Sequence, residues 1–442
     1  MNLLKEKLWR TSGLLALFSL VAKAAGLWRD RVLASQFGAS ADLDIYYSAF
    51  KIPDLIFNLF ILGAVSSAFI PVFIEHYQED KQRAWRLAQN FLNVAFAVIL
   101  AVSFVMLIFA RPAAYIIAPG FSEADMELLV QLLRIMLISP IIFAWSTIMG
   151  SVLQALQRFI AYAIAPILYN VGIIFGALYI VPFMRVRGYE EVFGLGAGVV
   201  LGAILHLLVQ LPASILAGFR FSNVFDLADQ GLRKIIRLMI PRTLGIGAYS
   251  IDSTVTNAIA STLGTGSITV FNFANNIQFV PISVLGISIA TAVFPQLSSH
   301  ASADENHQFR HRLSQALGRT FFIVGISAVL IYVFREWIIK MIYGVGIFQG
   351  ANIDITAQIL GIFMFGVVGQ SLVPIMSRAF YALQNTKTPV IVAVISILLN
   401  IGLGLLFTFR FHMGIEGLAW ALAISGNVNF LLLYGLFQRK YS

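Results

Sequence analysis

The first long apolar stretch of the sequence contains a cluster of ionisable side chains. Lys23, Arg29, Asp30 and Arg31 all fall within residues 12–36. In a helix, Lys23 and Asp30 lie seven residues apart on one face, and Arg29 lies one step round from Asp30. An arginine guanidinium is planar, stays charged and binds phosphate through two parallel hydrogen bonds. The cluster therefore predicts a site for an anionic group.

The second apolar stretch carries one polar stripe. Asp44, Lys51, Asp54 and Asn58 are spaced by 7, 3 and 4 residues, so a helix places them on one face. Pro53 lies inside this stripe and predicts a kink, because proline lacks the N–H that the helix needs. The stripe therefore predicts a second polar surface next to the first.

These charges admit two interpretations. In one, the basic residues of each stretch pair with its own acidic residues and only pin two helices together. In the other, they line a water-filled, net-cationic cavity. An ionisable group at mid-membrane costs roughly 2.5–3.5 kcal/mol on insertion scales, so it normally faces protein or water. We favour the cavity, with ion pairing as the alternative.

The second half of the chain carries mainly amides and hydroxyls at the comparable places. Its candidate side chains are Arg242, Asp252, Asn276, Asn400 and Ser425. Asp252, Asn400 and Ser425 offer the oxygen ligands that a hard cation such as Na⁺ prefers. The same groups are commonly hydrogen-bond partners between membrane helices, and we favour that second interpretation. Na⁺, as a coupling ion, is the one candidate cofactor.

The composition excludes an ordinary soluble protein. The chain has 442 residues, 59% hydrophobic and 12% charged, with a mean hydropathy of +0.84, whereas soluble domains carry about 25% charged residues. The net charge of +9 is dispersed along the chain, so no nucleic-acid partner is expected. The absence of cysteine excludes disulfides, thiolate catalysis and cysteine-ligated metals. A polytopic membrane protein remains.

Long apolar stretches predict an all-α fold with about twelve membrane-spanning helices, because backbone in lipid must satisfy its own hydrogen bonds. The predicted spans are 12–36, 43–73, 86–110, 127–153, 161–183, 192–218, 235–262, 268–297, 316–335, 353–380, 388–410 and 414–437. Amphipathic surface helices are expected between spans over 74–90, 220–237 and 300–319.

Basic residues outside the spans set the orientation. Eighteen of the 30 Lys and Arg fall on the side of the N-terminus and six on the opposite side, with the others in or near the spans. Positively charged loops stay in the cytoplasm. Both termini are therefore expected to be cytoplasmic.

The two halves of the chain resemble each other at an offset of about 225 residues. Residues 155–157 read Ala-Leu-Gln, as do residues 382–384, and Asn170 has a counterpart in Asn400. Six spans per half is an even number, so both halves enter the membrane in the same direction. We expect two parallel six-helix lobes, 1–220 and 221–442, around a central cavity, which is a transporter architecture.

The motifs of the chain resemble those of the MurJ (MviN) family of lipid II flippases, within the multidrug/oligosaccharidyl-lipid/polysaccharide exporter superfamily. The resemblance covers essentially the whole chain. The matching stretches are residues 26–30, 37–39, 49–55, 63–71, 153–159, 166–170, 241–245 and 379–384. It implies two parallel six-helix lobes in a bacterial cytoplasmic membrane.

The resemblance also implies a function. Such a protein would move the undecaprenyl-diphosphate-linked peptidoglycan precursor, lipid II, from the inner to the outer leaflet by alternating access. Arg29 matches the family's diphosphate-holding cation best, Asp30 and Asp44 match its neighbouring acids, and Lys23 stands where the family usually has arginine. The predicted substrate-binding set is Lys23, Arg29, Asp30, Asp44, Lys51, Asp54, Asn58, Arg242 and Asn276.

The chain departs from the family pattern at several cavity positions. The family carries an arginine pair and a later glutamate in span 2, where this chain has Phe57, Asn58 and Leu62. A common span 8 arginine falls at Asn276, and Arg242 is the candidate that compensates. Among the residues of the family's sodium site, Asn400 matches, but Gly404 stands where the family has a later aspartate.

Other function classes are weighed against the flippase. One alternative exports another lipid-linked oligosaccharide, of the O-antigen or exopolysaccharide type, and another is a non-transporting scaffold of the cell wall. No phosphate loop, zinc signature or catalytic triad spacing appears, so an enzyme is not expected. The expected partners are lipid II, membrane lipids and the cell-wall synthesis machinery, around a monomer.

Overall fold

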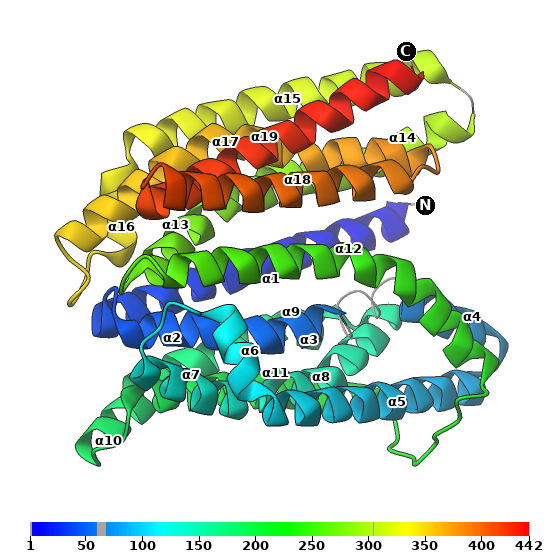
Figure 1. The fold of residues 1–442 in the computed structure, drawn as a ribbon. Helices are drawn as coiled ribbons and strands as arrows, with labels where there is room; N and C mark the ends of the chain where they lie inside the picture. The colour runs from blue at the N-terminus through cyan, green and yellow to red at the C-terminus, as the bar shows by residue number, and fades with distance from the viewer. Residues whose placement is uncertain (1, 60–67, 304, 442) are drawn as a thin grey trace. The chain divides into compact units, whose positions relative to one another are not determined.

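The chain is helical over the residues that the structure describes. The computed structural model describes the backbone of residues 2–59, 68–303 and 305–441, with side chains over the same ranges except 2–12, 16, 241–246 and 248 (Figure 1). No β-strand occurs within these ranges. The chain forms two compact units, Met1–Phe37 with Ala41–Thr254, and Gly38–Ser40 with Val255–Ser442. The lobe boundary expected at residue 220 stays a prediction, because compact units need not coincide with duplicated segments.

The first unit contains the N-terminal helices and most of α12. Its elements are α1 (Asn2–Phe37), α2 (Ala41–Ala49), α3 (Lys51–Phe57), α4 (Ile70–Glu79), α5 (Lys81–Ile108), α6 (Ala110–Ile117), α7 (Glu123–Met136), α8 (Ile138–Ala155), α9 (Phe159–Phe175), the π-helix η3 (Gly176–Ile180), α10 (Val181–Val186), α11 (Glu191–Leu216) and α12 (Gln230–Ser261).

Helix α11 lies at the centre of the first unit, packed against α7, α8 and α9, and α9 also packs against α1 (Figure 1). Glycines allow the close approach of α9 and α11. A Cβ atom on Gly172 would overlap the backbone of Gly202. Because apolar lipid provides little driving force for helix association, such tight backbone packing is a main source of stability.

The polar stripe of the predicted second span runs along two helices. Helix α2 ends at Ala49 and α3 begins at Lys51, with Phe50 between them. Ala49 is the residue whose carbonyl would accept the helical N–H that Pro53 lacks. Helical bonding resumes at once, as the Asp54 N–H donates to the Phe50 carbonyl at 2.8 Å. The helices are separated only at Phe50, whose backbone angles stay α-helical (φ −70°, ψ −24°), so the predicted kink stays a prediction.

The second unit is built around α17, which packs against α13, α14, α15, α16 and α19. Its apolar core contains Met376, Phe380 and Phe437. Its elements after the end of α12 are α13 (Ser267–Pro281), the π-helix η4 (Ile282–Ile287), α14 (Ser288–Ser302), α15 (Asn306–Val333), α16 (Arg335–Tyr343), α17 (Ala351–Ala382), α18 (Lys387–Leu405), the π-helix η5 (Leu406–Arg410) and α19 (Gly414–Tyr441).

Nine helical segments among the described residues are long and apolar enough to cross a membrane. They coincide with the predicted spans 3 to 6 and 8 to 12. The other three predicted spans fall on α1, on α2 with α3, and on α12, and each of these includes residues outside the described set. The all-α, membrane-spanning fold is confirmed, while the count of twelve crossings stays a prediction.

The internal duplication is visible in the backbone. Gln157 follows α8 with φ of 59°, and Gln384 follows α17 with φ of 57°. In each case the next residue's N–H returns to a carbonyl five residues earlier, at 2.8 and 2.9 Å. This left-handed helix ending favours glycine, so its occurrence at two glutamines in matching sequence positions indicates a shared origin.

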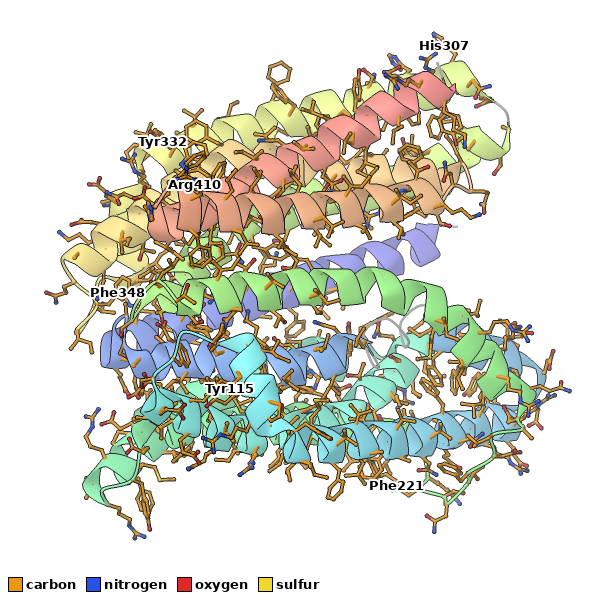
Figure 2. The ribbon with its side chains drawn as sticks, in the orientation of Figure 1. Tyr115, Phe221, His307, Tyr332, Phe348 and Arg410 are labelled. Atoms are coloured by element: carbon orange, nitrogen blue, oxygen red, sulfur yellow. The ribbon has the colours of Figure 1, made fainter. Side chains whose placement is uncertain are left out.

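The surface helix expected over 220–237 is wrong in its first half. Residues 219–229 form an irregular segment, and α12 begins only at Gln230. The backbone of this segment bonds to amide side chains of α5 instead. Asn93 donates to the carbonyls of Ser222 and Val224, both at 2.8 Å, near Phe221 in Figure 2. These tertiary hydrogen bonds replace the helical ones.

Candidate functional site

The charged cluster of α1 contains a close ion pair. The Arg29 Nε and Nη2 atoms donate to the same Asp30 oxygen, at 2.9 and 2.7 Å. The Asp30 side chain is 2% exposed and the Arg29 side chain 22%. The pairing alternative is therefore correct for these two residues. Arginine has five N–H donors, so this pair leaves three for a further anion.

The polar stripe of α3 is bonded to α12, within the same unit. The Lys51 ammonium donates to Ser253 Oγ at 3.0 Å, and Asn58 Nδ2 donates to Ser250 Oγ at 3.4 Å. Ser250 and Ser253 are three residues apart, on one face of α12. The ion-pairing interpretation expected Lys51 to pair with an acidic residue. Its hydrogen bond is to the Ser253 hydroxyl instead.

Asp54 lies on α3 between Lys51 and Asn58, and its side chain is exposed. Over the described part of the chain, no basic nitrogen lies within 4.0 Å of its carboxylate. It lies within electrostatic reach of Lys51 and Arg29. Together with Asp30 it balances the two positive charges of Arg29 and Lys51, so these four side chains carry no net charge when all are ionised.

Two tyrosines that the sequence argument missed complete this cluster. Tyr46 of α2 is 1% exposed, and among the described residues its hydroxyl has no hydrogen-bond partner. Tyr169 of α9 lies within electrostatic reach of Tyr46, Asp54 and Arg29. A phenol can donate to a phosphate oxygen, so these groups add neutral donors. Tyr169 directly precedes Asn170 within residues 166–170, one of the stretches that resemble the family. That position could have marked Tyr169 as a candidate site residue.

Helix α9 approaches α1 beside this cluster. A Cβ atom on Gly26 would lie 3.9 Å from Asn170 Oδ1. Asn170 Nδ2 donates to the Pro166 carbonyl of its own helix at 2.9 Å, while its Oδ1 is buried with no donor among the described residues. The asparagine therefore presents an acceptor toward α1.

The structure places the remaining predicted residues as follows. In the first unit, Lys23 is half-buried on α1, Asp44 is 2% exposed on α2 and Asp252 is half-buried on α12. Arg242 lies on α12, but its side chain is outside the described residues, as is Leu62 altogether. The structure therefore brings together Arg29, Asp30, Lys51, Asp54 and Asn58.

Three predicted residues belong to the second unit and are considered there. Asn276 is half-buried on α13, and Asn400 and Ser425 are 6% and 4% exposed on α18 and α19. Ser425 Oγ donates to the Leu422 carbonyl of its own helix at 3.1 Å. That bond lies within one helix, so both the hydrogen bond between helices and Na⁺ binding stay predictions for this serine.

An ion pair outside the spans joins α4 to α12. Lys234 Nζ lies 2.6 Å from Glu75 Oε2, and both side chains are half exposed. The hydrogen bond from Lys234 lowers the pKa of Glu75 below its ordinary value, and the charge of Lys234 adds to the effect. The carboxylate form of Glu75 is therefore the stable one in the folded state.

The first unit brings together an arginine and a lysine that have further N–H donors, two carboxylates and neutral hydroxyls. The family model for lipid II flippase MurJ matches residues 33–442. The chain belongs to the MurJ family. The family resemblance inferred from the motifs is thereby confirmed.

Individual members of the family match over nearly the whole chain. Lipid II flippase MurJ of Burkholderia cenocepacia is 30% identical over 431 residues, covering 96% of this chain and 82% of the relative. Probable lipid II flippase MurJ of Treponema pallidum is 29% identical over 445 residues, covering 99% and 83%.

Solved structures give the same assignment of fold. Lipid II flippase MurJ in an inward closed conformation matches with a TM-score of 0.81 at 25% identity, covering 96% of this chain and 87% of that one. A multidrug resistance MATE transporter of the MOP superfamily matches with a TM-score of 0.77 at 17% identity, covering 95% and 94%. The predicted fold is confirmed, and the chain is a multi-pass membrane protein of a transporter fold.

The structure explains two departures from the MurJ pattern. Phe57 occupies a position of the family's arginine pair, and its ring packs against Phe143 with centroids 5.2 Å apart. Asn58 occupies the other position and bonds to Ser250. At these two positions this chain therefore has an aromatic contact and an amide–hydroxyl bond.

Proposed function

We propose that this protein moves lipid II across the bacterial cytoplasmic membrane, from the inner to the outer leaflet, by alternating access. Membership of the MurJ family supports the substrate class. The flippase neither makes nor breaks a covalent bond in this proposal. Both termini lie in the cytoplasm, as the distribution of basic residues favours.

The observation that carries the proposal is the cluster around Arg29 and Lys51. A diphosphate cannot cross hydrocarbon without partners for its charge, because an uncompensated ion is too costly there. Arg29 has three N–H donors beyond its bonds to Asp30, and Lys51 has two beyond its bond to Ser253. These donors receive the diphosphate while the lipid tail stays in the bilayer.

A gradient must drive net transport, because the chain holds no nucleotide-binding motif to supply energy. Na⁺ is our candidate coupling ion, with Asp252, Asn400 and Ser425 as its oxygen donors. Dependence of transport on a Na⁺ gradient tests this part by itself. If transport is unchanged in the absence of Na⁺, the flippase proposal stands and the proposal of Na⁺ as the coupling ion is rejected.

The proposed function is tested in proteoliposomes. Purified protein is reconstituted with fluorescent lipid II, a membrane potential is imposed, and a membrane-impermeant quencher reports the lipid II in the accessible leaflet. Fluorescent phosphatidylglycerol in parallel vesicles is the control for general lipid scrambling. We expect faster translocation of lipid II than in protein-free vesicles and no effect on phosphatidylglycerol.

Two results would contradict the proposal. Equal translocation of both lipids would identify a nonspecific scramblase. No translocation by well-folded protein would reject lipid II as the substrate, and repeating the assay with another undecaprenyl-diphosphate-linked oligosaccharide would test the related exporter.

A further inference from the structure

Ser250 and Ser253 of α12 are the polar partners of α3, and nothing in the motif pattern assigned them. Their hydroxyls accept hydrogen bonds from Asn58 and Lys51 respectively. They lie 192 and 202 residues from those partners along the chain. The contact therefore depends on the tertiary fold.

Each hydroxyl keeps a hydrogen to donate. A serine hydroxyl is one donor and two acceptors, and here it is used as an acceptor. Over the described residues, neither Oγ atom donates to another group. Thr254, the neighbour of Ser253, differs, because its hydroxyl donates to the Ser250 carbonyl at 2.8 Å. Ser253 is half-buried, whereas Ser250 is 7% exposed.

Lys51 and Ser253 together form a compact donor pair. The ammonium has two N–H groups left and the hydroxyl one, all centred on two atoms 3.0 Å apart. Adjacent phosphoryl groups offer several oxygens within that spacing and accept strong, charge-assisted hydrogen bonds. A lipid-linked diphosphate is therefore the ligand class that this pair fits.

Lys51 is the basic residue of α3. Phe57 packs on an aromatic ring and Asn58 bonds to Ser250, so this part of α3 contributes only Lys51 as a positive charge. A neutral hydroxyl next to that charge supplies a donor without adding another costly ion to the membrane.

We propose that Ser253 is a diphosphate-binding residue that acts together with Lys51, and that Ser250 is a positioning residue that holds Asn58 beside them. This inference rests on the proposed function and deepens it. In it, α12 contributes directly to the substrate site through Ser253.

The test measures binding of farnesyl diphosphate, a short lipid diphosphate, to the purified full chain in detergent. The variants are Ser253→Ala, Ser253→Cys, which keeps the volume but donates weakly, and Ser253→Thr, which keeps the hydroxyl. Thr254→Val is the matched control, because its hydroxyl bonds within the helix. Dioctanoylphosphatidylglycerol, a phosphodiester, distinguishes a phospholipid site, and thermal melting monitors folding.

We expect Ser253→Ala and Ser253→Cys to raise the Kd for farnesyl diphosphate about tenfold, the loss of one hydrogen bond to a charged group. Ser253→Thr should remain within about threefold of wild type, a change of under one kcal/mol, and Thr254→Val should be unchanged. Ser250→Ala should have a smaller effect than Ser253→Ala, and Ser250→Thr should restore wild-type binding.

Other results overturn the inference in separable ways. Unchanged diphosphate binding by Ser253→Ala rejects the role of Ser253 and leaves the flippase proposal standing. An equal loss of diphosphate binding in Ser253→Thr and Thr254→Val shows that this part of α12 has only a structural role. An equal loss of phosphatidylglycerol binding shows a phospholipid site. Failure of the folded wild type to bind the diphosphate contradicts the proposed function itself.

Discussion

Arg29 and Asp30 are neighbours in sequence and partners in space, joined by two hydrogen bonds to one carboxylate oxygen. The aspartate is almost fully buried while the arginine stays partly accessible. The Asp30 carboxylate thus holds the Arg29 guanidinium through Nε and Nη2. The other three N–H groups of Arg29 are left for a further acceptor. Pairing and ligand binding are compatible functions of the same arginine.

Removal of Arg29 alone takes a cationic partner away from the buried Asp30 carboxylate. Breaking such a pair costs about 3–5 kcal/mol when both groups are fully buried, and less here because Arg29 is partly exposed. We expect Arg29→Gln to lower the melting temperature in detergent, and Arg29→Gln with Asp30→Asn to recover most of it. Equal melting temperatures for the single and double variants would show that the pair does not stabilise the fold.

The contact of α9 with α11 predicts a stability effect at a single glycine. Gly172→Ala places a methyl group on the Gly202 backbone. Overpacking of this kind costs about 1–3 kcal/mol or more where backbone must move. Gly325→Ala is the matched control on α15, since no atom lies within 4 Å of its added methyl among the described residues. Similar melting temperatures for the two variants would contradict the packing described for α9.

Asn90 tests the attachment of the irregular segment 219–229. Its side chain donates to the Asp226 carbonyl and accepts from the Asp226 N–H, both at 2.8 Å, and it is 1% exposed. Asn90→Ala removes both hydrogen bonds from the half-buried backbone of Asp226, at about 0.5–1.5 kcal/mol each. We expect faster limited proteolysis within 219–229 than in wild type. The control is Gln315→Ala on α15, a half-buried residue whose amide contacts His311 of the same helix, and it should be cleaved at the wild-type rate. Cleavage of Asn90→Ala at the wild-type rate would reject the attachment.

The Glu75–Lys234 pair predicts a pH dependence at this end of α12. The pKa of Glu75 is lowered from its ordinary 4.5 in the folded state by the hydrogen bond from Lys234. A lowered folded-state pKa stabilises the protein above pH 4.5, and that stabilisation is lost as the pH falls through the folded value. The melting temperature of Glu75→Gln should fall less between pH 5 and pH 3 than that of wild type. Parallel pH profiles would show that the pair is not formed in solution.

Local periodicity predicted much of the fold and part of the site. Apolar stretches predicted nine of the spans, and the run of ionisable residues in the first stretch marked the part of α1 that carries the Arg29–Asp30 pair. These features depend only on residues close in sequence.

Contacts between distant residues could not be predicted in this way. The bond of Lys51 to Ser253 joins residues whose types gave no reason to prefer one serine of α12 over another. The segment 219–229 has an amphipathic pattern, yet amides on α5 bond its backbone and prevent a helix. In both cases a tertiary hydrogen bond decides the outcome.

The central claim, that the site around Arg29 carries lipid II across the membrane, is tested most directly by complementation of a conditional lipid II flippase mutant. Wild type, Arg29→Lys and the stability-matched Arg29→Gln with Asp30→Asn are compared at equal membrane abundance. Growth should be restored by wild type, partly by Arg29→Lys, which keeps the charge but loses the planar fork, and not by the double variant. Full rescue by the double variant, or no rescue by well-expressed wild type, would contradict the account.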